Sequence, residues 1–158
     1  MIKRILFFLL ISSFLSGCEK DDICLSPTTP KLILRFYDAS TTTAVKSVPH
    51  FSVIASGKTD SLFTAKNTDS IAIPLDVNAS ETTYIFKTSS TGNLQDNRYN
   101  NIKLRYTTED VFVSRSCGFK TIFKDISIEA GTDWFQSFTP NSITVIDHET
   151  AAHVKIYH

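Results

Sequence analysis

The chain has 158 residues, of which 42% are hydrophobic and 20% are charged, a composition typical of a globular protein and not of a disordered one. The 16 Lys and Arg residues balance the 16 Asp and Glu residues, which excludes the strongly basic class of nucleic-acid-binding proteins. Without residues 1–17, which contain two basic residues and no acidic one, 14 basic residues (16 minus two) face 16 acidic ones, and roughly 140 residues remain for one domain with a hydrophobic core.

The first 17 residues have the pattern of a secretory signal peptide. Lys3 and Arg4 make a positively charged start, an apolar run follows over residues 5–15, and small residues end the segment. The run of about eleven residues is too short to cross a bilayer, which needs about 20. We therefore predict a signal peptide at 1–17, with a buried core helix as the alternative.

The end of this segment carries a lipidation motif. Leu15-Ser16-Gly17-Cys18 resembles the lipobox of bacterial lipoproteins at all four positions. The resemblance implies that Cys18 bears a diacylglycerol group and an N-acyl chain, and that it is the first residue of the mature protein. Because each buried methylene contributes about 0.8 kcal/mol, two or more acyl chains anchor a protein stably in a lipid bilayer. A secreted protein with a free Cys18 is the alternative.

A charged segment follows the cysteine. Lys20, Asp21 and Asp22 are similar to the lysine-then-acidic signal of Bacteroidetes surface lipoproteins. The resemblance implies an outer-membrane lipoprotein displayed at the cell surface. The alternative is an anchor on the periplasmic face of the outer membrane, with the charges serving only to solvate the tether.

Residues 18–30 are predicted to form this lipidated tether, because their prolines oppose regular structure. With Cys18 acylated, Cys24 and Cys117 remain, and an even number of cysteines in an oxidising compartment favours a disulfide. Such a bond would close a loop of about 90 residues and stabilise the fold by about 4–5 kcal/mol in the chain-entropy treatment. Two separate buried thiols are the alternative.

From residue 32 onward, apolar residues recur with a period of two, which predicts β-strands. No segment has the period and the caps of a long helix. The predicted strands are 32–37, 48–55, 61–64, 70–75, 83–87, 102–106, 111–115, 119–128, 142–146 and 153–157.

About ten short strands favour an all-β domain over residues 31–158. We predict a single antiparallel β-sandwich, immunoglobulin-like or transthyretin-like in general shape, with a small β-barrel as the alternative. The longest polar stretch, residues 88–101, is predicted to be a loop, and residues 109–110 to be a turn.

The histidines near the C-terminus do not match a known metal motif. His148 and His153 are five residues apart, whereas the zinc-protease helix needs a spacing of four for both rings to share one face. His158 would lie far from His148 along an extended strand. We therefore expect no metal and no cofactor.

Motifs of catalysis are also missing from the sequence. It contains no Gly-x-Ser-x-Gly nucleophile turn, no phosphate loop and no dinucleotide fingerprint. A non-enzymatic protein is thus the expectation, although a hydrolase remains an alternative because carboxylates can be paired by the fold alone.

Two features of the sequence point to sugars. Trp134 lies beside Phe135 and Phe138 just after a predicted turn, and could form an aromatic platform for a glycan or a peptide; packing in the core is the alternative. Ser61 and Ser70 lie in Asp-Ser-apolar triplets that resemble the O-glycosylation sites of Bacteroidetes envelope proteins.

Two segments together resemble an uncharacterised lipoprotein family of Bacteroidetes that is classed as a domain of unknown function. They are residues 18–37, except for 25–26, and residues 111–120, which include Cys117-Gly118-Phe119-Lys120. The resemblance implies the anchor, the disulfide and the envelope compartment, but no activity. We therefore expect a binding module held in the lipid bilayer through acylated Cys18. Its expected partner is an outer-membrane barrel protein or a surface glycan, and a glycan-binding accessory lipoprotein is the alternative.

Overall fold

The computed structural model of the protein describes Cys24, residues 29–131 and residues 133–158. Within this part of the chain, no helix is long and apolar enough to cross a membrane. The predictions that fall outside the described residues are the signal peptide at 1–17, acylated Cys18 and the export residues Lys20, Asp21 and Asp22.

The described residues form ten β-strands and one short 3₁₀ helix. The strands are β1 (Leu32–Tyr37), β2 (Val48–Ala55), β3 (Ser61–Thr68), β4 (Ser70–Ile73), β5 (Glu81–Ser89), β6 (Asn97–Ser114), β7 (Gly118–Ala130), β8 (Ser137–Thr139), β9 (Ser142–Ile146) and β10 (Val154–Tyr157). The 3₁₀ helix η1 (Leu94–Asp96) lies between β5 and β6.

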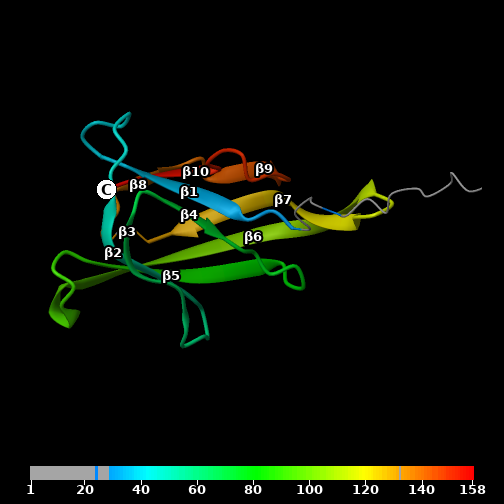
Figure 1. Ribbon diagram of the computed structural model, residues 1–158. Helices are drawn as coiled ribbons and strands as arrows, with labels where there is room; N and C mark the ends of the chain where they lie inside the picture. Colours follow the sequence, from blue (N-terminus) through cyan, green and yellow to red (C-terminus); the bar gives the residue numbers. More distant parts are fainter. Residues whose placement is uncertain (1–23, 25–28, 132) are drawn as a thin grey trace, which may run out of the picture.

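The strands make two sheets that pack against each other (Figure 1). The four-stranded sheet has the order β4-β1-β10-β8, and the six-stranded sheet has the order β3-β2-β5-β6-β7-β9. Neither sheet closes on itself, so the predicted β-sandwich is confirmed and the alternative of a small barrel is wrong. The strand pairs of the described chain are antiparallel except for β1 with β10, which run parallel.

The core lies between the sheets and is filled by alternate residues of each strand. In β1, Leu34 and Phe36 are buried whereas Arg35 is exposed. Burying one such apolar side chain contributes about 1.5–3 kcal/mol. The largest buried rings are Phe36, Phe51, Phe86, Phe123 and Phe135.

The predicted turn at residues 109–110 is wrong, because β6 passes through it without a break. The strand has left the core at this point, and polar cross-strand contacts replace apolar packing. Lys124 pairs with Glu109 at 2.8 Å, and the Thr121 hydroxyl donates to the Asp110 carboxylate at 2.6 Å. Polar residues therefore continue the strand here and do not end it.

The predicted loop at 88–101 is shorter in the structure. β5 continues to Ser89, which pairs with Asn97 at the start of β6. Polar Asn100 belongs to the core side of β6 and is 2% exposed. Its amide donates to the Gly131 carbonyl and accepts the backbone N–H of Trp134 at 2.9 Å, so hydrogen bonds satisfy its polar atoms.

Candidate functional site

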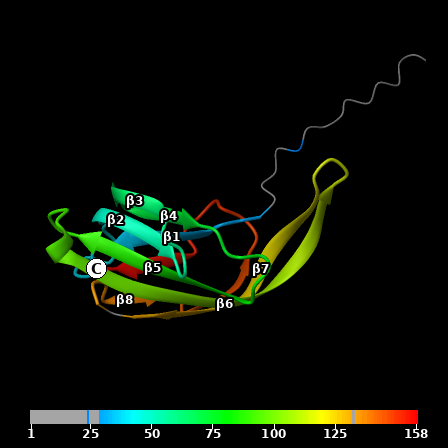
Figure 2. The ribbon, with the colours of Figure 1, turned by 90° about the horizontal axis from the view of Figure 1, so that it is seen from below.

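A long hairpin projects from the sandwich and carries the most distinctive surface of the molecule (Figure 2). β9 pairs with β7 only as far as Phe123, and beyond this residue no other strand of the described chain pairs with β6 or β7. We call residues 109–122, from the Glu109–Ile122 pair to the turn, the hairpin arm. The arm is a two-stranded ribbon whose residues are all exposed or partly exposed except Ile122.

The turn of the arm is fixed by local backbone chemistry. Gly118 has φ +68°, in the left-handed region that glycine adopts without strain. The backbone N–H of Cys117 donates to the Ser114 hydroxyl at 3.0 Å. These contacts hold Cys117 at the very end of the arm.

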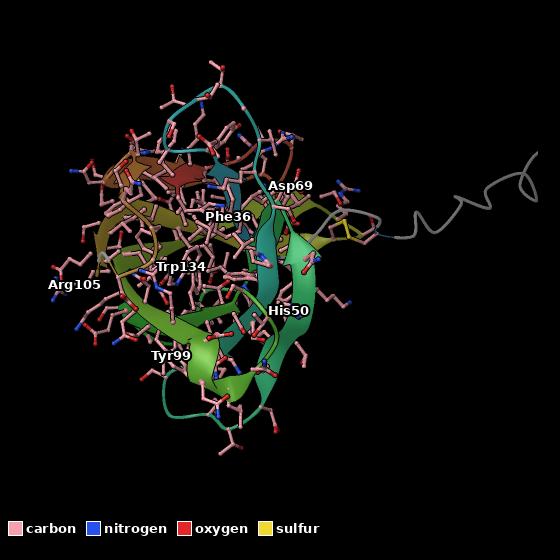
Figure 3. All side chains as sticks on the ribbon, turned by 90° about the vertical axis from the view of Figure 1, so that its left-hand side faces the viewer. Phe36, His50, Asp69, Tyr99, Arg105 and Trp134 are labelled. Atoms are coloured by element: carbon pink, nitrogen blue, oxygen red, sulfur yellow. A yellow bond between two sulfur atoms is a disulfide. The ribbon has the colours of Figure 1, made fainter. Side chains whose placement is uncertain are left out.

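Cys117 is joined to Cys24 by a disulfide, which confirms the predicted pairing. The two Cα atoms are 4.9 Å apart, and the residues are separated by 93 positions in the sequence. The bond lies at the outer end of the molecule, away from the core side chains (Figure 3). Cys24, a residue of the predicted tether, is thereby linked to the tip of the hairpin arm.

An exposed aromatic pair flanks the disulfide. Phe112 and Phe119 face each other across the arm, with ring centroids 5.6 Å apart in an edge-to-face arrangement. They remain 62% and 64% exposed, more than any other aromatic ring among the described residues. Sequence analysis did not identify this pair, although both residues lie within seven positions of Cys117 and share one face of the ribbon.

The opposite face of the arm lies toward the start of the domain, near Pro30. A cavity of about 410 Å³ lies there, between Val113 and Lys120 of the arm, Pro30 and residues 147–150. Lys120 closes one side, since its ammonium group donates to the Asp147 carbonyl at 2.8 Å. This face is partly covered, which leaves Phe112 and Phe119 on the free face.

Two histidines stack beside this cavity. The rings of His148 and His153 are 5.6 Å apart and nearly parallel. His153 accepts the backbone N–H of Ile33 through Nδ1 at 2.9 Å. Burial lowers the pKa of His153, and the nearby His148 lowers it further. Within the described ranges, no group of three or more His, Cys, Asp or Glu side chains is placed to hold a metal ion.

Trp134 does not form the exposed platform proposed from the sequence. Its side chain is 8% exposed and packs between Phe36, Phe51 and Phe135 in the core (Figure 3). A ring buried on these sides offers no face for a sugar to stack on. The part that remains accessible lines a cavity of about 350 Å³ together with Arg98 and seven other residues, which include Thr88 of β5 and His158.

The two candidate glycosylation sites differ in their surroundings. Ser70 is half-buried in β4, and its hydroxyl donates to the Leu34 carbonyl at 3.2 Å. Ser61 begins β3, a strand at the edge of the larger sheet. Glycosylation at either serine stays a prediction.

A further cavity, of about 540 Å³, lies beside β5 and residues 74–76. Burial raises the pKa of Tyr84 in its wall to about 12, and its hydroxyl donates to the Pro74 carbonyl. A tyrosine with this pKa stays neutral near pH 7 and acts as a structural hydrogen-bond donor. It is not available as a catalytic base.

Comparison with known proteins identifies a family whose function is unknown. A family of unknown function (DUF6452) matches residues 50–158, a range that includes the whole hairpin arm and Cys117. No curated protein and no solved structure matches the chain.

Proposed function

The chain belongs to this family of unknown function, and from its own residues we propose that it is an outer-membrane lipoprotein that binds an envelope partner without catalysing a reaction. In this proposal the acyl groups on Cys18 hold it in the bilayer, and Lys20, Asp21 and Asp22 direct it to the cell surface. The observation that carries the proposal is the Cys24–Cys117 disulfide. Disulfides form and persist in oxidising compartments and are rare in the cytosol.

The place of the disulfide also suits a lipid anchor. Cys18 precedes Cys24 by six residues. An extended chain spans about 3.3–3.6 Å per residue, so Cys18 lies within about 20 Å of Cys24. The bond therefore ties the tip of the hairpin arm to the anchored end of the chain, and it sets which end of the sandwich faces the membrane.

The two histidines with lowered pKa values make contacts within the fold. His153 and His158 have pKa values lowered by burial, as a general base requires, but they lie at opposite ends of β10. His153 accepts a backbone N–H, and His158 packs edge-on against Phe36 and Trp134. Both rings are therefore engaged in structural contacts.

The anchor is tested by mass spectrometry and fractionation of the protein expressed in its own envelope. We expect an acylated N-terminal peptide beginning at Cys18, and release of the Cys18→Ser variant from membranes. The matched control is Cys24→Ser, which removes a neighbouring cysteine and its disulfide and should stay acylated. A Cys18→Ser protein that still sediments with membranes would refute the anchor.

Surface display needs a separate test. Protease added to intact cells should degrade the wild-type protein, whereas a variant with Lys20, Asp21 and Asp22 replaced by alanine should be protected until the outer membrane is opened. Protection of the wild-type protein in intact cells would place it on the periplasmic face instead.

A further inference from the structure

We propose that the tip of the hairpin arm is a second membrane contact, in which Phe112 and Phe119 insert into the headgroup region of the bilayer that holds the acyl chains. The inference rests on the proposed function, because it requires an anchor at Cys18. The proposed partner of the arm tip is therefore a lipid surface. The two rings at this tip lie outside the core of the sandwich.

The first argument is the exposure of the two rings. They are 62% and 64% exposed and contact each other across the ribbon, whereas the other seven Phe residues of the described chain are buried or partly buried in the core. Neither ring fills a cavity of the domain. Apolar rings at such a position gain from transfer into a membrane interface, where aromatic side chains are enriched and apolar faces are buried.

The second argument is distance. Cys117 lies two residues before Phe119, and its Cα is 4.9 Å from that of Cys24. The tether between Cys18 and Cys24 reaches at most about 20 Å. Acyl chains on Cys18 thus hold the aromatic pair next to the bilayer at a high effective concentration, so that even weak insertion is favoured.

The third argument is the chemistry around the rings. Arg115 stands exposed in the turn between the two strands of the arm. A guanidinium group at this place suits lipid phosphates, with which it forms bidentate hydrogen bonds. The nearest carboxylate of the arm, Asp110, accepts a hydrogen bond from Thr121 and lies farther from the tip. An apolar pair beside a cation favours a phospholipid interface over a protein surface.

The test uses the full mature protein, with acylation of Cys18 verified by mass spectrometry, in vesicles of phosphatidylcholine or of brominated phosphatidylcholine. Brominated acyl chains quench a tryptophan that enters the membrane. The Phe119→Trp variant should lose emission in brominated vesicles and shift its emission maximum to shorter wavelength. The native Trp134, the one tryptophan of the sequence, is buried in the core and supplies the baseline in wild-type protein.

The matched control is Leu94→Trp. Leu94 is 80% exposed in η1, at the other end of β6 from the hairpin arm (Figure 1). Phe119 pairs with Phe112, and β6 rises by up to about 50 Å from Asn97 to Phe112 at about 3.3 Å per residue. This variant should keep the same emission in both kinds of vesicle.

A second measurement does not depend on a new tryptophan. Trypsin should cleave after Arg115 slowly in vesicles and quickly in detergent, and the double change Phe112→Ser and Phe119→Ser should remove the protection in vesicles. Non-reducing mass spectrometry of each variant confirms that Cys24 and Cys117 are still linked.

The outcomes separate the two proposals. Equal emission of Phe119→Trp in both lipids, with Cys18 acylated, refutes membrane insertion and leaves the lipid anchor intact. Protection of Arg115 in native envelopes but not in pure lipid vesicles also refutes it, and assigns the aromatic pair to a protein partner. A mature protein without acyl chains refutes both the anchor and this inference.

Discussion

At the scale of single residues, the packing of Trp134 predicts a large effect on stability. The ring centroid lies 5.2 Å from that of Phe135 and 6.0 Å from that of Phe51, and the side chain is 8% exposed. Replacement by alanine removes these contacts and leaves a cavity, so Trp134→Ala should lower the free energy of unfolding by about 3–5 kcal/mol. Urea unfolding followed by circular dichroism measures the change.

Two control variants make this prediction specific. Trp134→Phe should cost less, because the Trp134 Nε1–H has no hydrogen-bond partner in the described part of the chain and its removal breaks no bond. Phe119→Ala removes an aromatic ring that is 64% exposed, and should change the stability by about 0.5 kcal/mol or less. An unchanged urea midpoint for Trp134→Ala would contradict the burial of this ring.

Protonation of His153 should weaken the fold as the pH falls. Burial is the main cause that lowers its pKa from the ordinary value of 6.5, and His158 is shifted in the same direction for the same reason. The unfolded chain then binds more protons than the folded one, so the stability is fully present above pH 6.5 and is lost as the pH falls through the lowered pKa. Protonation of Nδ1 would also break the hydrogen bond from Ile33.

Thermal unfolding over the range from about pH 7.5 to about pH 5 measures this effect. The midpoint should fall with pH in the wild-type protein and fall less in His153→Gln, which cannot take up the proton. The carboxyl groups of Asp38 and Glu81 do not account for the pH dependence of the midpoint in this range. Their pKa values are lowered by hydrogen bonds with Thr41 and with Lys103 respectively, so both groups stay charged in the folded protein. A His153→Gln protein with the same pH dependence as the wild type would exclude this histidine as the cause.

At the scale of the elements, the disulfide should protect the hairpin arm more than the sandwich. The chain-entropy treatment gives an upper limit of about 4–5 kcal/mol for a loop of this length. Breaking the bond also frees the tether and the arm in the folded state, so the loss in Cys117→Ser should be smaller than this limit. Hydrogen exchange should therefore accelerate more in residues 109–122 than in β5.

The elements also show where sequence patterns stop being informative. The period of two predicted the positions of the core strands except β8, because one face of each predicted strand is apolar. It failed at residues 109–110, where a ribbon exposed on both sides needs no apolar face and its polar residues resemble a turn. Phe112 and Phe119 were overlooked for the same reason, since alternation alone does not say whether a ring faces a core or a solvent.

At the scale of the whole molecule, the disulfide and the sandwich could be predicted, but the order of strands could not. Alternating side chains look the same in parallel and antiparallel pairs. Nothing local in β1 or β10 therefore indicated that the first and last strands run side by side, with Leu34 opposite Val154. The same holds for the candidate site. The number of cysteines predicted the disulfide, whereas the position of this disulfide at the tip of the hairpin arm depends on the tertiary fold.

This closing pair of strands makes the C-terminus essential to the fold. β10 lies between β1 and β8, and its Val154 and Ile156 are almost fully buried. A protein that ends at residue 152 would lose both apolar side chains, detach β8 and leave one edge of β1 unpaired. We expect it to show no cooperative unfolding transition, whereas Lys155→Ala, a change of an exposed residue in the same strand, should keep the wild-type midpoint. A cooperative transition in the truncated protein would show that the larger sheet folds without the smaller one.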